Sequence, residues 1–540
     1  KKDPDNGKNI AIVGAGPSGL TWGYYLSDKG YNVTVYESAP KAGGWLRYGI
    51  PEYRLPKKIL DKEIRLMCKN GMKIIYKTQL GKDITLSELN KNNDAVYLAL
   101  GAQNAVPMRV KGNNLEGCFL GVDFLRDLTL GKKIKLEKKV AVIGGGNTAI
   151  DCARTAARLG ANVTLVYRRT RQEMPAEAFE VDAAEEEGIK FHFLTNPVEN
   201  IGKKGKLKSI KMEKMKLGEP DDSGRRRPEP TGEFFKEDYG TVIAAISQKP
   251  EVAFTAKKAN QIRGKELPLT KWDTAIADEE SQFTGLGNIF AGGDFRRGPA
   301  TAIEAIADGR MASEAIDRFL NNQPMVDPIK RFDSKKEKKL KDVDTKEFEQ
   351  YDEIARSKMP ELEPKVRASS FKEVETGFEE EDARAEAQRC LECGCNVNES
   401  CDLRSYATEY NINVDLFMGD KNKHPIDDSH PFIRRDANKC INCGRCVRIC
   451  AEVQGPGVLG YIYRGFTTYV APEFGESLSK TNCEICGKCI EVCPVGALLP
   501  KNTNTKLNPH LSEKTIQNCG LCGTGCNIEV SIQDNQVTII

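Results

Sequence analysis

Cysteine is the residue whose type and spacing carry the most chemistry in this chain. Of its 18 cysteines, only Cys68, Cys118 and Cys152 lie in the first 389 residues, and they stand far apart. The other fifteen lie between positions 390 and 526, at short spacings that suit metal binding by thiolates. We therefore expect isolated thiols in a first region and a series of metal centres in a second one.

Two runs of four cysteines have the spacing of paired 4Fe-4S clusters, and the second run is followed by Pro494. In this pattern the fourth cysteine of each run ligates the cluster of the other run. Zinc is the competing interpretation of paired C-x2-C motifs, but eight cysteines in this arrangement favour two clusters. The predicted ligand sets are Cys440, Cys443, Cys446 and Cys493 for one cluster, and Cys483, Cys486, Cys489 and Cys450 for the other.

Two further cysteine groups are less diagnostic. The first could hold another 4Fe-4S cluster, with structural zinc as the alternative, and consists of Cys390, Cys393, Cys395 and Cys401. The second supplies only three thiolates, Cys519, Cys522 and Cys526, so a fourth ligand would lie beyond Ile540 or come from a partner. Because the chain also starts without Met, at Lys1, we expect it to be a piece of a longer protein.

A glycine-rich turn at 14–19 predicts a first dinucleotide site, because it follows an apolar strand predicted at 10–13. Gly14 permits the tight turn, Gly16 lets the backbone approach a pyrophosphate, and Gly19 allows close packing of helix on strand. The helix that starts here offers free N–H groups to the anion. Glu37 ends the next strand, about 20 residues further on, where an acid can bind ribose hydroxyls.

A second glycine-rich turn, at 144–149, follows an apolar strand predicted at 140–143. The next strand, at 162–166, leads into Arg168 and Arg169 rather than an acid. Arginine forks match a 2′-phosphate, so this turn favours NADP(H) over NAD(H), with a surface basic cluster as the alternative. The residues predicted to bind the second nucleotide are Gly144, Gly146, Asn147, Thr148, Arg168 and Arg169.

These elements predict an α/β fold with two Rossmann-type dinucleotide-binding units, then a helical linker and small α+β iron–sulfur domains. The linker is expected because the segment beginning at 334–339 is rich in lysine and stays charged up to 388. The expected boundaries are 1–135 and 249–325 for two parts of an FAD-binding unit, 136–248 for an NADP(H)-binding unit, 326–389 for the linker, 390–430 for an iron–sulfur element, 431–505 for a two-cluster domain, and 515–540 for the start of a further iron–sulfur domain.

The bulk composition excludes several classes of protein. The net charge of +3 over 540 residues argues against a nucleic-acid partner recruited by a basic surface. No run of 18 apolar residues is present, so we expect no transmembrane segment. A secretory signal is not visible, and the cysteine spacing is that of clusters, so we expect a reducing, cytoplasmic compartment.

Several motifs of the first region resemble the small subunit of NADPH-dependent glutamate synthase and its relatives, which include the large subunit of the bifurcating NADH-dependent ferredoxin:NADP oxidoreductase. These motifs lie at 43–46, 48–56, 167–169, 173–176, 291–294, 298–303 and 308–310, and the resemblance covers roughly residues 8–395. One departure is Ser247, where the family usually has glycine.

This resemblance implies which residues line an FAD. They are Gly14, Gly16, Gly19, Glu37, Gly44, Leu46 and Arg54, with Asp294 at the ribityl or pyrophosphate region and Thr301 and Ala302 at the flavin ring. Gly101 and Gly293 are also predicted to contact a dinucleotide. Residues 292–294 suit this role from their chemistry too, because glycines let the backbone come close and an acid accepts from sugar hydroxyls. A turn with no ligand is the alternative there.

The second region carries other resemblances. Residues 385–393 resemble the cluster-binding element of the same family, and 424–526 resemble the cluster arm of the large peripheral subunit of complex I. Residues 440–493 follow the pattern of a two-cluster ferredoxin. Residues 519–526 resemble the start of molybdopterin- or tungstopterin-containing oxidoreductases such as formate dehydrogenases, which implies a fused catalytic domain or other redox subunits as partners.

Three functions remain open from the sequence. The first is an electron-transfer flavoprotein that moves electrons between NADP(H), FAD and a chain of 4Fe-4S clusters, as a module of a formate dehydrogenase- or hydrogenase-type complex that could be electron-bifurcating and could use ferredoxin. The second is a glutamate synthase-type NADPH donor, and the third is a non-enzymatic electron-wiring subunit. No catalytic side chain is predicted, because the cofactors carry the chemistry.

Overall fold

The computed structural model describes residues 2–220, 224–333, 339, 342–349, 351–391, 401–417, 419–420, 422–501, 513–519, 524–533 and 536–539. The chain forms two compact units. The first contains residues 1–326 and 358–381, and the second contains residues 327–357 and 382–540. Within the described ranges, no helix has both the length and the apolar character needed to cross a membrane.

The first unit contains a parallel five-stranded sheet in the order β15-β4-β1-β2-β3. Its strands are β1 (Asn9–Val13), β2 (Asn32–Glu37), β3 (Lys73–Tyr76), β4 (Ala95–Leu98) and β15 (Ile289–Ala291). Strand β15 arrives from much later in the chain and pairs in parallel with β4. The carboxyl ends of β1, β4 and β15 therefore share one edge, where a dinucleotide binds in such sheets.

A second parallel sheet of the first unit has the order β6-β13-β7-β8-β9. Its strands are β6 (Cys118–Leu120), β7 (Lys139–Ile143), β8 (Asn162–Val166), β9 (Lys190–His192) and β13 (Thr241–Ala244). Both sheets have buried, apolar central strands with helices against them. The predicted pair of Rossmann-type units is thus confirmed.

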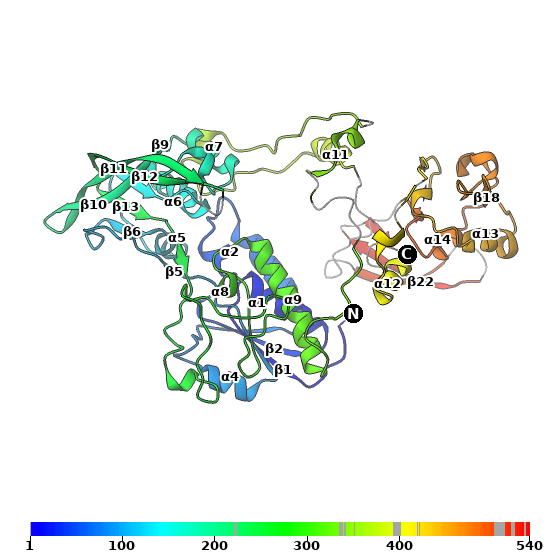
Figure 1. Cartoon of the computed structure of the whole chain (residues 1–540), viewed down its shortest axis with the longest axis horizontal. Coiled ribbons are helices and arrows are strands. Elements are labelled where there is room, and N and C mark those ends of the chain that lie inside the picture. The colour runs from blue at the N-terminus through cyan, green and yellow to red at the C-terminus, as the bar shows by residue number, and fades with distance from the viewer. Residues whose placement is uncertain are drawn as a thin grey trace. The chain divides into compact units, whose positions relative to one another are not determined.

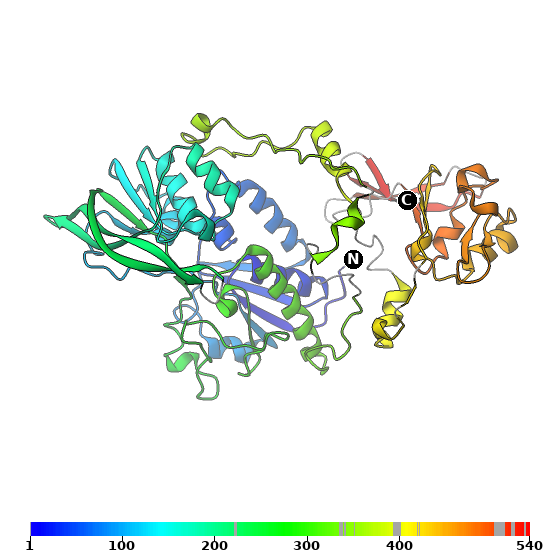
Figure 2. The ribbon, with the colours of Figure 1, turned by 45° about the horizontal axis from the view of Figure 1, so that its top comes forward.

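Two helices begin directly after the glycine turns, where each chain segment leaves the end of its strand. Helix α1 (Pro17–Asp28) starts after Gly16 with proline in its first turn, and α6 (Asn147–Arg158) starts after Gly146. Helix α9 (Ala302–Leu320) lies beside α1 in Figures 1 and 2. The remaining helices of this unit include α2 (Trp45–Tyr48), α3 (Lys57–Met67), α4 (Leu86–Asn92), α5 (Gly121–Thr129), α7 (Ala178–Glu186) and α8 (Asp294–Arg297).

Two antiparallel features interrupt the Rossmann pattern. Strands β10 (Thr195–Lys203), β11 (Lys206–Pro220) and β12 (Arg226–Asp238) form a long three-stranded sheet beside the second parallel sheet (Figures 1 and 2). Strands β5 (Asn104–Ala105) and β14 (Gln248–Lys249) pair where the chain enters and leaves the second Rossmann unit. The two crossings between the Rossmann units therefore run side by side.

Residues 358–381, which we call the strap, pack back onto the first unit. The backbone N–H of Val374 donates to the carbonyl oxygen of Tyr53 at 3.0 Å, and the Arg158 side chain donates to the carbonyl oxygen of Ser370. Arg367 of the strap is fully buried among carboxylates. Only α10 (Pro364–Arg367) and the start of α11 (Glu380–Gln388) are helical here, and within the strap only Arg367 and Val374 are buried. This part of the segment predicted as a solvated helical linker is therefore mostly irregular and exposed.

The second unit is built from short elements around cysteines. The sheet β16-β17-β20 and the pair β18-β19 enclose a small apolar core that includes Ile433, Leu459 and Leu498. Its elements are α12 (Asp402–Glu409), α13 (Arg445–Arg448), α14 (Lys488–Glu491), a π-helix (Ile449–Gln454), β16 (Ile426–Asp427), β17 (Ile433–Asp436), β18 (Gly460–Ile462), β19 (Tyr469–Ala471), β20 (Leu498–Pro500), β21 (Glu513–Asn518), β22 (Asn527–Gln533) and β23 (Gln536–Ile539).

Candidate functional site

The first glycine turn is shaped by two different demands. Gly14 has a φ of +105°, and an added Cβ would lie 2.2 Å from the carbonyl oxygen of Ala99. A Cβ on Gly19 would lie 2.1 Å from the carbonyl oxygen of Gly14. These two glycines are required by the fold itself. In contrast, a Cβ on Gly16 would meet only the Cα of Gly44, at 3.9 Å, so the space in front of Gly16 is open.

The loop at 43–46 completes this cradle from the other side. Gly44 has a φ of +50°, and a Cβ there would lie 2.8 Å from the Cα of Gly16. Leu46 packs against the core of the first sheet. Two glycine backbones thus face each other beside the start of α1, which is the shape that a pyrophosphate needs for close approach.

Glu37 lies at the end of β2 with its carboxylate turned toward the glycine turn. It accepts from the backbone N–H of Ala15 at 2.8 Å and from that of Ala39 at 2.7 Å. Burial raises the pKa of Glu37, although these N–H donors oppose the shift. The carboxylate is therefore fixed beside the turn, where it suits the acceptor that adenine ribose hydroxyls require.

The turn after β15 brings a second acid to the same edge of the sheet. Gly293 has a φ of +61°, and its backbone N–H donates to the buried carboxylate of Asp308 at 2.9 Å. Arg297 donates to the same carboxylate from Nε at 2.9 Å. Burial raises the pKa of Asp294, the next residue after Gly293, to about 6. Asp308 on α9 thus holds the turn that presents Asp294.

The other residues predicted for the flavin occupy different settings. Gly101 follows β4 with a φ of +67°. Thr301 caps the start of α9, where its hydroxyl accepts from the backbone N–H of Glu304, and Ala302 is exposed beside it. The guanidinium of Arg54, the remaining residue predicted to line the flavin, is bonded to acids of the second Rossmann unit.

Arg54 joins the two Rossmann units through an ion-pair cluster. Its Nη1 donates to both carboxylate oxygens of Asp151 on α6, at 2.8 and 3.0 Å. Its Nε lies 2.6 Å from Glu180 on α7. Burial raises the pKa of Asp151 to about 6, against the opposing effect of Arg54. Arg54 therefore compensates the charges of two carboxylates, Asp151 and Glu180, which are buried near the glycine turn of the second Rossmann unit.

The second glycine turn repeats the division of roles seen in the first. A Cβ on Gly144 would lie 2.3 Å from the carbonyl oxygen of Ala245, whereas a Cβ on Gly146 would meet only Pro175, at 3.9 Å. Asn147 is exposed at the start of α6, and its side-chain oxygen accepts from the backbone N–H of Glu177. Thr148 beside it is half-buried. Here too the second position is open for a pyrophosphate.

The two arginines after β8 are not equivalent. Arg168 is exposed, whereas Arg169 is buried and donates from Nε to the carbonyl oxygen of Arg226 at 2.7 Å. Arg171, slightly further on, is paired with Asp182 and Glu185 of α7. The structure therefore places one exposed cation and one buried cation at this strand end.

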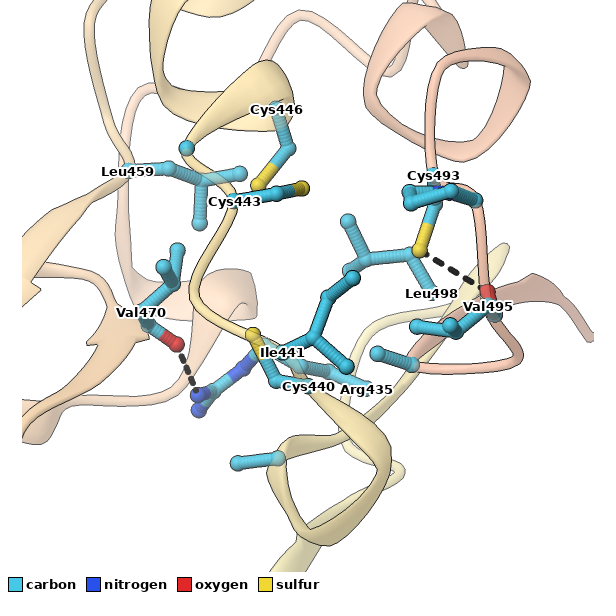
Figure 3. Close-up of a pocket in the computed structure, with 14 residues that line it drawn as sticks. Arg435, Cys440, Ile441, Cys443, Cys446, Leu459, Val470, Cys493, Val495 and Leu498 are labelled. Carbon is cyan, nitrogen blue, oxygen red and sulfur yellow. Dashed lines mark hydrogen bonds between the residues drawn. The ribbon is translucent and has the colours of Figure 1, made fainter. Parts of the chain in front are cut away.

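Four cysteines of the second unit surround one pocket, which Figure 3 shows in close-up. The three from the first run come from the loop before α13 and from α13 itself, and the fourth follows α14. Cys493 donates to the carbonyl oxygen of Val495 at 2.9 Å, a bond drawn in Figure 3. The four are Cys440, Cys443, Cys446 and Cys493, the set that the spacing predicts for one cluster.

The remaining four cysteines of the two runs surround a second pocket, namely Cys450, Cys483, Cys486 and Cys489. Burial raises the pKa of Cys446 to about 11 and that of Cys489 to about 12, so these thiols need a cation to ionise near pH 7. Among the described residues, no three His, Cys, Asp or Glu side chains lie close enough to hold a single metal ion. A 4Fe-4S cube has its four thiolate ligands spread around four irons, and each pocket is lined by four cysteines.

The other predicted cysteine groups are described only in part. Cys393, Cys395 and Cys522 lie outside the described residues. Cys401 precedes α12, and the next residue, Asp402, donates its backbone N–H to the carbonyl oxygen of Pro494 at 3.2 Å. Cys390 is exposed. Cys519 donates its backbone N–H to the carbonyl oxygen of Cys526 at 2.7 Å across the β21–β22 hairpin.

Sequence reasoning missed several residues that shape these sites. Asp308 lies within a motif that carries the family resemblance, but its role in holding Gly293 depends on a contact between α9 and the β15 turn. Asp151 and Glu180 give no motif signal at all. Arg226 belongs to the run of three arginines at 225–227, a visible signal whose position beside β8 only the folded hairpin reveals.

Comparison with family models matches both units. Residues 8–309 match the model of pyridine nucleotide-disulphide oxidoreductase. Residues 430–499 match the ferredoxin-like domain of NADH-quinone oxidoreductase subunit 3. The predicted small ferredoxin-like domain after the two Rossmann units is therefore confirmed.

Named relatives include subunits of larger enzymes. The chain is 38% identical over 440 residues to the NADPH-Fe(3+) oxidoreductase subunit beta of Geobacter sulfurreducens, covering 72% of this chain and 62% of that one. It is 42% identical over 397 residues to the NADP(+)-dependent formate dehydrogenase subunit beta of Moorella thermoacetica, covering 72% and 55%. The glutamate synthase (NADPH) small chain of Azospirillum brasilense is 33% identical, covering 58% and 67%. The chain thus spans little more than half the length of the first two relatives.

Among solved structures, FprA of Mycobacterium tuberculosis in complex with NADPH superposes with a TM-score of 0.51 and 21% identity. The superposition covers 59% of this chain and 85% of that one. At this identity the likeness concerns the fold, and it supports the arrangement of two dinucleotide-binding units in the first unit.

Proposed function

Because this chain belongs to the pyridine nucleotide-disulphide oxidoreductase family, whose members bind FAD and NAD(P), we propose that it is the NADP(H)-linked flavin and iron–sulfur part of a formate dehydrogenase-type complex. The observation that carries this proposal is the combination, in one chain, of two open glycine turns with two pockets that each have four cysteines around them. The relative named as an NADP(+)-dependent formate dehydrogenase subunit beta supports the choice of complex.

FAD is proposed to occupy the first glycine turn. Gly16 and Gly44 would admit its pyrophosphate, Glu37 would accept from ribose hydroxyls, and Asp294 would accept from the ribityl chain or the ribose. Held there by these residues, FAD would supply the ability to accept a hydride from a nicotinamide and to pass electrons on singly. The residues of this chain supply position and charge for that exchange, and no side chain is needed as an acid or base.

NADP(H) is proposed to occupy the second glycine turn. Gly146 leaves room for its pyrophosphate at the start of α6, and Arg168 is the exposed cation at the end of β8. An arginine there favours a nucleotide with a 2′-phosphate, whereas an acid would favour the free ribose hydroxyl. The short β5–β14 ribbon and the ion pairs of Arg54 hold the second Rossmann unit against the first Rossmann unit.

The cysteine pockets are proposed to hold two 4Fe-4S clusters that accept or donate single electrons. Cys390 to Cys401 would hold a third, and Cys519 to Cys526 would contribute to a fourth. The hydrogen bond from Asp402 to Pro494 supports a third cluster next to the pocket that contains Cys493. The proposed partners are a catalytic domain or subunit that oxidises the substrate, and other redox subunits of the same complex.

A second candidate function is delivery of electrons from NADPH to ferric iron. The relative named as an NADPH-Fe(3+) oxidoreductase subunit beta favours it, at 38% identity over 440 residues. Both candidates use the same nucleotide and cluster sites, and they differ only in the terminal reaction.

An anaerobic optical titration tests the shared part of the proposal. Purified chain with its FAD and iron restored should lose flavin absorbance at about 450 nm on addition of NADPH, with much weaker bleaching by NADH. Bleaching by NADH alone would contradict the NADP(H) assignment, and a chain that retains no FAD would contradict the whole proposal.

The full-length protein then separates the two terminal reactions. Formate-dependent reduction of NADP(+) should occur if the complex is a formate dehydrogenase, and ferric citrate should not compete for the electrons. NADPH-dependent reduction of ferric citrate with no response to formate would favour the second candidate instead.

A further inference from the structure

We propose that Arg226, at the start of strand β12, is a further arginine of the NADP(H) site and contacts the 2′-phosphate of the nucleotide. This inference rests on the proposed function, because it assigns a specificity residue to the second glycine turn. The β11–β12 hairpin is far in sequence from the turn at 144–149 and from the arginines that follow β8. Its position is therefore a property of the tertiary structure.

A side-chain hydrogen bond from Arg169 to the backbone of Arg226 holds the start of β12 at the end of β8. The Nε of Arg169 donates to the carbonyl oxygen of Arg226 at 2.7 Å. The neighbouring segment is fastened to the same place, because Leu194 donates its N–H to the carbonyl oxygen of Arg169, and Met215 of β11 donates to that of Leu194. The beginning of β12 is thus attached to the arginine pair whose strand end receives the 2′ position of a bound dinucleotide.

The side chain of Arg226 points toward the same turn. Its Nε and Nη2 donate to Oε1 of Glu173 at 2.7 and 2.6 Å. Glu173 is itself fixed by Thr170, whose backbone N–H donates to Oε2 at 3.2 Å. Glu173 thus links the Arg226 guanidinium to the backbone of Thr170, which directly follows Arg169. Glu173 is therefore a positioning residue for Arg226.

Enough of the guanidinium remains for a ligand. Arginine has five N–H donors in a planar fork, and Glu173 engages Nε and Nη2 through a single carboxylate oxygen. The Arg226 side chain is 45% exposed, so a phosphate can reach it from solvent. A phosphate monoester carries close to two negative charges at pH 7 and offers three acceptor oxygens, which suits more than one arginine.

The charges around this strand end favour an anion. Arg168 and Arg226 bring two guanidinium groups to this strand end, and Glu173 places one carboxylate beside that of Arg226. Arg171 does not add to the site, because Asp182 and Glu185 of α7 pair with its guanidinium. A further exposed cation for the 2′-phosphate, besides Arg168, therefore comes from the hairpin.

The test measures binding of nucleotide fragments to the purified chain by isothermal titration calorimetry. The probes are 2′,5′-ADP, which has the 2′-phosphate, and 5′-AMP, which lacks it. Arg226→Ala should weaken binding of 2′,5′-ADP by about 10-fold to 100-fold, the range for a charge-assisted hydrogen bond, and should change 5′-AMP binding by less than about twofold. Arg226→Lys should retain part of the affinity, because it keeps the charge and loses the fork.

Arg227→Ala is the matched control. It removes the same charge one residue away, and strand alternation places its side chain on the opposite face of β12. It should leave both dissociation constants within about twofold of wild type, which also excludes a general effect of net charge. Circular dichroism of each variant checks that the hairpin change leaves the fold intact.

The outcomes separate this inference from the proposed function. Equal weakening of both probes by Arg226→Ala, or unchanged binding of 2′,5′-ADP, would overturn the role of Arg226 while a wild-type preference for 2′,5′-ADP would still support NADP(H). If the wild-type chain binds 2′,5′-ADP no more tightly than 5′-AMP, both the NADP(H) assignment and the Arg226 contact are wrong.

Discussion

At the scale of single residues, the glycines of one motif carry different physical roles. Gly14 and Gly144 are required because an added Cβ would collide with backbone oxygen at 2.2 and 2.3 Å. Gly16 and Gly146 instead have open space in front of them. The motif therefore contains one position that the fold needs and one position that the fold leaves open, and the two can be separated by mutation.

Gly14→Ala and Gly16→Ala are expected to fail in different ways. Gly14→Ala should lower the free energy of unfolding by about 3 kcal/mol or more, because it combines a backbone collision with a positive φ. Gly16→Ala should change that free energy of the FAD-free chain by less than about 1 kcal/mol, because its φ of −82° suits alanine. It should nevertheless weaken FAD binding by about tenfold, measured by fluorescence titration. Normal FAD binding by Gly16→Ala would contradict a pyrophosphate at this position.

A buried acid makes the stability of the first unit depend on pH. The pKa of Asp151 is about 6, above its ordinary value, because burial disfavours its charge more than Arg54 favours it. The folded state thus holds this proton more tightly than the unfolded state. The resulting stability is fully present below the unfolded pKa of about 3.9 and is lost as the pH rises through 6.

Asp151→Asn removes this titration and should flatten the profile. Between pH 4 and pH 7, the unfolding free energy of wild type should fall relative to Asp151→Asn by up to about 3 kcal/mol. Urea unfolding of both proteins across this range measures the difference, which cancels the titration of groups they share. A difference that stays constant or grows in favour of wild type at higher pH would be inconsistent with the raised pKa.

At the scale of elements, short helices divide the cysteine runs between two pockets. Helices α13 and α14 are each preceded by a glycine, Gly444 and Gly487, whose backbone is in the left-handed conformation. Each glycine directly follows the second cysteine of its run. Each run then continues past its helix start, so that its fourth cysteine reaches the other pocket. The position of each run's fourth cysteine at the other pocket therefore follows from the near-equivalent geometry of two short loop–helix units.

Paired cysteine substitutions test this division. Cys493→Ala alone should reduce the iron content by about four atoms per chain, and adding Cys440→Ala should remove no more, since both residues surround the same pocket. Adding Cys483→Ala to Cys493→Ala should instead remove about eight, because Cys483 belongs to the second pocket. Iron analysis of anaerobically reconstituted protein decides between them. If the Cys440/Cys493 pair loses twice as much iron as Cys493→Ala alone, the ligand sets do not cross.

At the scale of the whole molecule, the two units have separate apolar cores. Trp22 and Tyr97 belong to the core of the first sheet, whereas Ile433 and Leu459 belong to the small core between the cysteine pockets. The first core is extensive, but the second includes several cysteines themselves. We therefore expect the second unit to depend on metal for its stability in a way that the first one does not.

Ligand removal should act on the two units separately. Differential scanning calorimetry of the full chain should show two transitions, and FAD at 100 times its dissociation constant should stabilise only the first unit, by about 2.7 kcal/mol. Removal of iron with a chelator should lower only the transition of the second unit. Hydrogen exchange identifies which residues belong to each transition. A single transition that shifts with both treatments would contradict independent units.

Much of this arrangement could be predicted from local sequence, because the relevant physics is local. Glycine turns after apolar strands predict two dinucleotide sites, and cysteine spacing predicts two crossed ligand sets, since each needs only a short stretch of backbone geometry. The difference between Glu37 and Arg168 at two strand ends also predicts two kinds of nucleotide from single positions.

Tertiary structure decided everything that depends on segments far apart in the chain. It brought β15 and Asp294 beside the first turn, returned the strap to the first unit, paired Arg54 with Asp151, and placed Arg226 at the end of β8. These contacts join residues from about 60 to more than 300 positions apart, and burial and charge pairing select them. No local pattern encodes such partners, because their energy arises only when the whole fold removes them from water.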